Sequence, residues 1–108
     1  MPDGRSLLTA CDDMHVNLYD VANLSLVDSF SGHGSWVLSV AAHPNGNAFA
    51  TGGSDTKVKL FDIRSRSCVQ TLGDHSDQVW SVSFNTDGSR LASTSDDKSI
   101  LCYSVGGE

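Results

Sequence analysis

The chain has 108 residues, with 7 Lys and Arg against 13 Asp and Glu, and a formal net charge of −6. This length suits one small domain, and an acidic chain with scattered cations is not expected to bind nucleic acid directly. No apolar run approaches the roughly 18 residues of a membrane-spanning helix, so no membrane association is expected. The first residues lack a secretory signal pattern, so secretion is not expected.

The cysteines indicate a reducing compartment. Cys11, Cys68 and Cys102 are widely spaced and odd in number, which does not suit a disulfide framework. Cys11 and Cys102 fall in predicted strands, where we expect them to pack as small apolar side chains.

The sequence repeats itself every 42 residues without a gap. The turn tripeptide at residues 2–4 recurs at 44–46 and at 86–88. The same step relates Asp13, Asp55 and Asp97; Val16, Val58 and Ile100; and Tyr19, Phe61 and Tyr103. A repeat of this length indicates an array of similar supersecondary units.

In chain order, the repeat predicts three strands, then four, then three. Residues 1–30 contain the first three, beginning with Ser6–Ala10. Residues 36–72 contain four, at Val37–Ala42, Ala48–Gly53, Lys57–Ile63 and Cys68–Leu72. Residues 79–105 contain the last three, ending with Ser99–Tyr103. Residues 57–63 alternate with period two, with Val58 and Leu60 on one face and Phe61 on the other, and Gly, Pro and Asn clusters separate the strands.

Four antiparallel strands in about 40–45 residues are typical of one blade of a β-propeller. The chain resembles the WD-repeat family through Gly32-His33, Asp55 and Phe61-Asp62 in one repeat and Asp74-His75, Asp97 and Tyr103-Ser104 in the next. Phe61 and Tyr103 stand where the family has tryptophan. The resemblance implies an all-β fold of about two and a half four-stranded antiparallel blades from a seven-bladed ring. Residues 1–30 and 79–105 would be partial blades, and residues 36–72 a complete one.

The resemblance also implies a hydrogen-bonded tetrad in each blade, made by a His, a Ser or Thr, an Asp and the tryptophan. At the matching positions this chain has His33, Thr51, Asp55 and Phe61, and then His75, Ser93, Asp97 and Tyr103. Phe61 cannot donate a hydrogen bond. The hydroxyl of Tyr103 can donate one, although it lies farther out than an indole N–H would.

Ser, His and Asp are also the parts of a nucleophilic triad. The trio recurs at identical offsets in two repeats, whereas an active site needs one copy, and no Gly-x-Ser-x-Gly elbow is present. We therefore expect no enzyme activity. The four histidines lack the short spacing of metal ligands, so neither a metal nor another cofactor is expected.

In the implied blade geometry, the loops that enter the innermost strands share one face of the ring with the turns between the second and third strands. This candidate protein-binding face comprises Ser35, Trp36, Asp77, Gln78, Asp12, Ser54 and Asp96. An exposed tryptophan beside acidic side chains suits a peptide that carries Arg and an apolar residue. We expect Trp80 to fill a gap between blades, and Trp36 could do the same or lie on the face.

Residues 31–40, 74–82 and 91–100 resemble the last blades of one subfamily, within a likeness that spans residues 24–105. This subfamily is the WD-repeat subunit of the superkiller complex and its plant vernalisation-independence counterpart. The resemblance implies a non-catalytic scaffold in the nucleus and the cytoplasm that binds proteins of the exosome-linked superkiller complex and the RNA polymerase II-associated factor complex. Another WD-repeat adaptor, of a ubiquitin ligase or a signalling pathway, and an RNA-facing propeller are the alternatives.

The repeat count does not close a ring. Propellers have about 4–8 blades, whereas 108/42 is about 2.6 repeats. Open sheet edges are therefore expected along Ser6–Ala10 and Ser99–Tyr103. We expect the remaining blades to come from a longer chain, of which this would be the C-terminal part, or from another copy.

Overall fold

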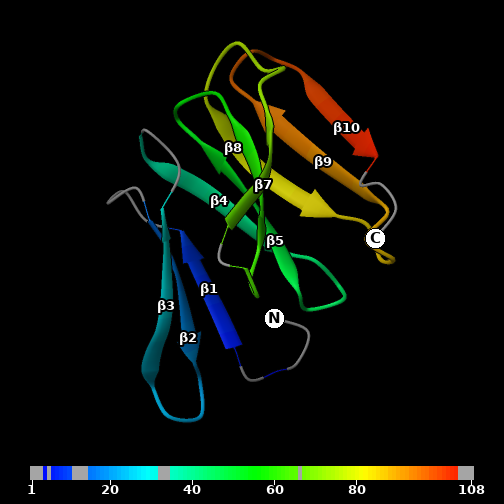
Figure 1. Cartoon of the computed structure of the whole chain (residues 1–108). Helices are drawn as coiled ribbons and strands as arrows, with labels where there is room; N and C mark the ends of the chain where they lie inside the picture. The colour runs from blue at the N-terminus through cyan, green and yellow to red at the C-terminus, as the bar shows by residue number, and fades with distance from the viewer. Residues whose placement is uncertain (1–3, 5, 11–14, 32–34, 66, 105–108) are drawn as a thin grey trace.

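The computed structural model describes residues 4, 6–10, 15–31, 35–65 and 67–104. Within these residues the chain forms ten strands in three antiparallel sheets, and it forms no helix (Figure 1). The all-β prediction is confirmed. The three sheets follow one another in chain order across Figure 1, from the blue first sheet through the second to the orange and red third sheet.

The first sheet has the order β1-β2-β3, with bounds Ser6–Ala10, His15–Asp20 and Ser25–Ser31. The Asp20 side chain shapes the turn after β2, because its carboxylate accepts hydrogen bonds from the Ala22 amide at 3.0 Å and from Asn23 Nδ2 at 2.7 Å. Such local bonds are the reason that Asp is favoured where a strand reverses.

The second sheet has four strands in the order β4-β5-β6-β7, with bounds Val37–Ala42, Ala48–Gly53, Val58–Asp62 and Ser67–Leu72. The first two predicted strands have the observed bounds, the third is one residue shorter at each end, and the fourth begins one residue earlier. Gly46, with φ of 79°, supports the turn between β4 and β5, because this backbone conformation disfavours residues with a Cβ.

The third sheet has the order β10-β9-β8, with bounds Val79–Phe84 for β8, Arg90–Ser95 for β9 and Ile100–Ser104 for β10. β1 and β10 are edge strands, as predicted, since neither has a partner strand beyond it among the described residues.

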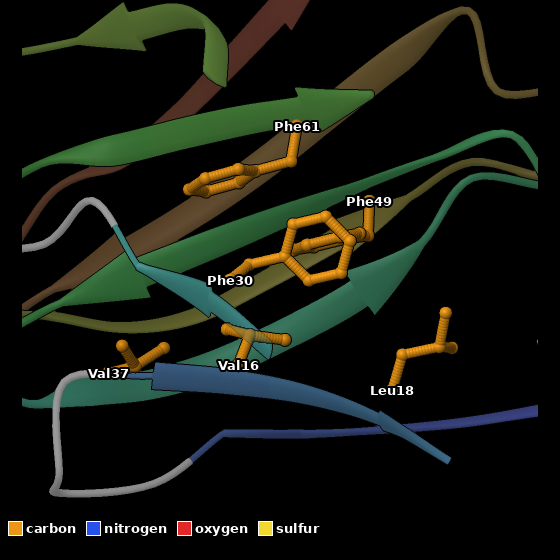
Figure 2. Packing of buried hydrophobic residues seen from close by; sticks show 6 residues of the cluster. All are labelled: Val16, Leu18, Phe30, Val37, Phe49 and Phe61. Carbon is orange, nitrogen blue, oxygen red and sulfur yellow. The ribbon is translucent and has the colours of Figure 1, made fainter. Parts of the chain in front are cut away.

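Two apolar clusters join the sheets. The first lies between the first and second sheets and contains Val16, Leu18, Phe30, Val37, Phe49 and Phe61 (Figure 2). Phe49 stacks on Phe61 with ring centres 5.1 Å apart, and Phe30 meets Phe49 edge-on at 5.0 Å. The second cluster lies between the second and third sheets and contains Ala50, Val58, Leu60, Val79, Val82 and Leu91. The second sheet is therefore buried on both faces, which agrees with the alternation predicted for β6.

A histidine also joins the second and third sheets, at the end of the strands where β4 turns into β5. His43 Nε2 lies 3.1 Å from the carbonyl oxygen of Gly88, and Nδ1 accepts the amide of Asn45. The imidazole therefore donates through Nε2 and is neutral in this arrangement. Gly88 has φ of 77°, and a Cβ there would lie 2.4 Å from the His43 ring, so the contact requires glycine.

We predict that Phe49→Ala lowers the free energy of unfolding by about 3–5 kcal/mol. The ring is fully buried and contacts aromatic rings from both sheets, so its removal leaves a cavity that neither sheet can fill. Urea denaturation followed by circular dichroism measures the loss. Val69→Ala is the control, because this side chain on β7 is 62% exposed and its truncation should cost less than about 0.5 kcal/mol. Equal losses in the two variants would contradict the prediction.

Candidate functional site

The loops that enter the innermost strands lie against the turns between the second and third strands, in the second and third sheets alike. The amide of Ser54 donates to the carbonyl oxygen of Trp36 at 2.9 Å, and the amide of Asp96 donates to that of Gln78 at 3.1 Å. Each residue of the second pair is 42 positions after its counterpart in the first. The 42-residue repeat thus produces the same contact between loop and turn in both sheets.

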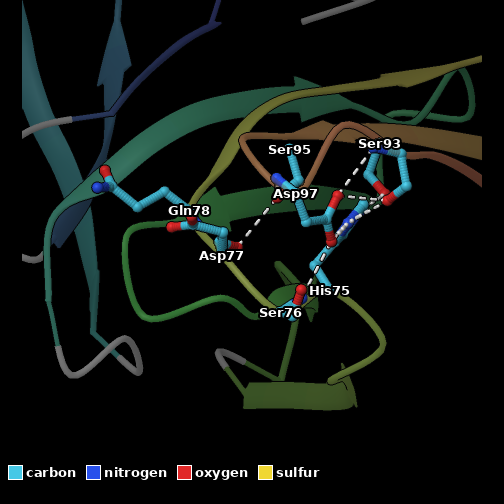
Figure 3. A network of polar contacts seen from close by, with 8 residues as sticks. His75, Ser76, Asp77, Gln78, Ser93, Ser95 and Asp97 are labelled. Atoms are coloured by element: carbon cyan, nitrogen blue, oxygen red, sulfur yellow. Dashed lines mark hydrogen bonds and ion pairs between the residues drawn. The ribbon is translucent and has the colours of Figure 1, made fainter.

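Side chains reinforce both loop pairs. In the second sheet, the hydroxyls of Ser35 and Ser54 share a hydrogen bond. In the third sheet, Ser95 Oγ donates to the carbonyl oxygen of Asp77 at 3.1 Å, and the Asp77 carboxylate accepts the amide of Gln78 at 2.8 Å (Figure 3). The structure thus groups the residues predicted for the binding face into Ser35, Trp36 and Ser54 in one sheet and Asp77, Gln78 and Asp96 in the next; Asp12 lies outside the described residues.

Both tryptophans are half exposed, Trp36 at 56% and Trp80 at 49%. The expectation that Trp80 fills a gap between blades is wrong. The register between β8 and β9 shifts between Val79 and Ser81, so Trp80 is the unpaired residue of a β-bulge. Trp36 directly precedes β4 and belongs to the loop that Ser54 holds.

A polar network lies beneath the loops of the third sheet. His75 is 4% exposed, with Nε2 2.7 Å from Ser93 Oγ and Nδ1 3.0 Å from Asp97 Oδ2 (Figure 3). The same carboxylate oxygen accepts the amide of Ser76 at 3.0 Å. Three segments of chain therefore meet at one imidazole, and the loop before β8 is held to β9 and to the turn that follows it.

Ser99 is a further member of this network, and its role was not predicted from the sequence. Its hydroxyl donates to Asp97 Oδ1, its amide donates to the same oxygen at 2.9 Å, and the hydroxyl lies 3.2 Å from His75 Nδ1. The repeat could not reveal it, because Lys57 occupies the corresponding position 42 residues earlier. Only the amide contact is common to both positions, since the Lys57 amide donates to Asp55 at 3.1 Å.

The pKa of the Asp97 carboxyl is held well below its usual range. The hydroxyl of Ser99 is the largest cause, and the Ser76 amide, His75 and the Ser99 amide lower it further, against the opposing effect of desolvation. The carboxylate is therefore ionised at neutral pH and accepts every hydrogen bond it makes. Ser93, His75 and Asp97 have the residue types of a triad, but Ser93 is fully buried, and its hydroxyl cannot reach a substrate in this structure.

Tyr103 does not complete the network. Its hydroxyl is buried and makes no hydrogen bond to any described residue. This burial raises the pKa of Tyr103, the negative charges of Asp74 and Asp97 add to the effect, and the neighbouring Ser93 hydroxyl opposes it. The ring packs against the second apolar cluster, so the residue contributes by apolar contact.

The preceding set of tetrad positions is described in part. Thr51 is fully buried in β5, and Phe61 is 2% exposed in the first apolar cluster, where it stacks on Phe49. Asp55 accepts the amide of Lys57. His33 lies outside the described residues.

No cluster of three or more His, Cys, Asp or Glu suited to a metal ion occurs in the described part of the chain. The same residues contain no helix that is long and apolar enough to cross a membrane. Cys68 and Cys102 are exposed free thiols, so the expectation that Cys102 packs as a buried apolar residue is wrong; Cys11 lies outside the described residues.

The family described as "WD domain, G-beta repeat" matches residues 24–62 and 66–104. The chain belongs to the WD-repeat family. The boundaries of the two matches, 24 and 66, and 62 and 104, are 42 residues apart, in agreement with the period of the sequence. A comparison with curated proteins finds no match. Each WD repeat here covers the outermost strand of one sheet and the three inner strands of the next, since residues 24–62 span β3 to β6 and residues 66–104 span β7 to β10.

We predict that His75→Ala lowers the free energy of unfolding by about 1–3 kcal/mol, because it leaves the buried Ser93 hydroxyl without its partner. Thermal unfolding measures the effect. Ser76→Ala is the matched control, since the network uses only the backbone amide of this exposed residue. An unchanged midpoint in the His75 variant would show that the network does not stabilise the fold.

We predict that the contribution of Asp97 to stability is constant near neutral pH and is lost in acid. Because its pKa in the folded chain lies below the ordinary value of 3.8, the contribution is present above that value and disappears as the pH falls toward the folded pKa. The difference in urea midpoint between the unmodified chain and Asp97→Asn should therefore shrink between about pH 5 and about pH 2. Asp77→Asn, on the loop before β8, is the control. A difference that grows in acid would contradict the assignment.

Proposed function

We propose that the chain is a non-catalytic WD-repeat scaffold that binds a protein partner through the face formed by Ser35, Trp36, Ser54, Asp77, Gln78 and Asp96. WD-repeat domains serve as protein–protein interaction scaffolds, and membership of that family supports this general role. The observation that carries the proposal is the exposed Trp36 indole, in a loop that the Ser54 amide holds in place. Interface energy is concentrated in aromatic anchors of this kind.

The chemistry of the face favours a peptide with an Arg beside an apolar residue. The half-exposed indole of Trp36 offers apolar surface and a π-face that attracts a guanidinium group. Asp77 and Asp96 are exposed on the neighbouring loops and add negative charge. The formal charge of −6 acts in the same direction over longer range, because it favours encounters with basic segments.

We propose the superkiller complex and the RNA polymerase II-associated factor complex as the assemblies this scaffold serves, in the cytoplasm and the nucleus, with a seven-bladed ring as the complete propeller. This part of the proposal rests on the resemblance of residues 31–40, 74–82 and 91–100 to that subfamily. Affinity purification of the tagged chain, with quantitative mass spectrometry, tests it. Recovery of ubiquitin-ligase or signalling components in place of the two complexes would favour the alternative adaptors.

Direct RNA binding is the competing function, and salt dependence separates it from peptide binding. A phosphate interface built on several Lys or Arg contacts weakens steeply as salt concentration rises. We expect no RNA retention at physiological salt. Retention that disappears with added salt would favour the RNA-facing alternative.

We predict that Trp36→Ala weakens binding of an Arg-containing peptide by about thirtyfold or more, because truncation of an aromatic anchor typically costs at least about 2 kcal/mol. The probe is a synthetic peptide array in which each Arg-plus-apolar sequence is paired with the same sequence carrying Gln in place of Arg, read by fluorescence polarisation. Val69→Ala, an exposed apolar truncation on β7, is the control. Unchanged affinity in a folded Trp36 variant would exclude this face as the site.

A further inference from the structure

The connection from β6 to the first residue of β7 has the sequence Arg-Ser-Arg-Ser at residues 64–67, which holds two of the seven Lys and Arg residues of this acidic chain. The repeat does not require these arginines, because residues 22 and 24, which lie 42 positions earlier, are Ala and Leu. Arg64, Ser65 and Ser67 are exposed, and the hydroxyls of the two serines share a hydrogen bond of 2.7 Å. Arg66 lies outside the described residues, so the argument that follows uses Arg64.

An arginine three residues before a serine is a pattern that many protein kinases select. Carboxylates in the substrate groove of such a kinase form paired, charge-assisted hydrogen bonds with the guanidinium group. Among the serines and threonines of the full sequence, two have an arginine three positions earlier, namely Ser67 after Arg64 and Ser93 after Arg90. Ser93 is fully buried with its hydroxyl 2.7 Å from His75 Nε2, whereas Ser67 is exposed. Of these two serines, the folded chain therefore presents Ser67 to an enzyme.

Ser67 lies where an enzyme can approach it from solvent. It begins β7, the outermost strand of the four-stranded second sheet, and no described strand pairs with the outer edge of β7. The carbonyl oxygen of Asn47 accepts the amide of Ile63, so the turn after β6 lies beside the turn between β4 and β5. Ser54 follows β5 at the other end of the sheet. A modification of Ser67 is therefore remote from the candidate binding face.

We propose that Ser67 is a phosphorylation site for a serine kinase that selects arginine at the third position before the acceptor. ATP is the phosphoryl donor: Ser67 Oγ forms a bond to the γ-phosphorus, the bond from that phosphorus to ADP breaks, and a base of the kinase takes the hydroxyl proton. The product carries about −1.5 to −2 additional charge at neutral pH. The proposal does not depend on the peptide-binding face, since Ser67 lies at the opposite end of the second sheet.

The 42-residue step supplies a matched control for Ser67. Ser25 is exposed, begins the outer strand β3 and has Asp20 as its cross-strand partner, just as Ser67 begins β7 opposite Asp62. The residue three positions before Ser25 is Ala22. The two serines therefore share their place in the sheet and their acidic neighbour, while only Ser67 has the arginine that the kinase would select.

The test is incubation of the folded 108-residue chain with ATP, Mg²⁺ and a purified kinase of this specificity, followed by phosphopeptide mapping by mass spectrometry. We expect one phosphate per chain, on Ser67, and none on Ser25 or Ser93. Ser67→Ala should remove the incorporation. Arg64→Gln should slow it by about tenfold or more, the loss expected for one charge-assisted contact. Both substituted side chains are exposed, so circular dichroism should show an unchanged fold.

Ala22→Arg is the converse experiment. It gives the first sheet the arginine that Arg64 provides in the second, so Ser25 should become an acceptor. A folded chain that takes up no phosphate, a phosphate on Ser93, or an equal rate in Arg64→Gln would each overturn the proposal. Modification of Ser67 that begins only after unfolding in urea would also overturn it, because the reaction would then belong to the unfolded chain.

Discussion

Burial of the second sheet on both faces is the interaction on which the rest of the structure depends. β5 supplies Phe49 to one apolar cluster and Ala50 to the other, so both neighbouring sheets pack against this strand. Gly52, in the same strand, allows the third sheet to approach closely, because a Cβ at this position would lie 2.7 Å from a methyl group of Val79. The outer two sheets bury apolar side chains against this central layer and gain stability from that burial.

Each WD repeat spans parts of two neighbouring sheets, and this arrangement couples the sheets further. Each repeat places its first strand at the outer edge of one sheet and its next three in the following sheet. A sheet therefore cannot separate from its neighbour without stretching a covalent connection within one repeat. This arrangement resembles other repeat proteins, in which stability is shared between units and the interfaces between them.

The loops of the candidate binding face are held by polar contacts. His75, Asp97 and Ser99 hold the loop before β8, and backbone bonds to Trp36 and Gln78 hold the turns beside it. An interaction surface built in this way loses little conformational entropy when a partner binds, because its loops are already ordered. The two tryptophans remain half exposed because none of the described strands or loops packs over them.

The strands and their repetition could be predicted from the sequence, because alternation and turn residues act locally. The bounds of β4 and β5 follow from the 42-residue step and the turn tripeptides, whereas the pairing of His75 with Asp97 and Ser93 was implied by the resemblance to the WD-repeat family. The sequence did not reveal which side chains are covered. Trp80 and Cys102 are exposed because no described strand or loop packs over them, and Ser99 joins the network because folding brings it beside His75. Exposure and polar contact depend on which elements meet in space, and local sequence patterns do not encode those contacts.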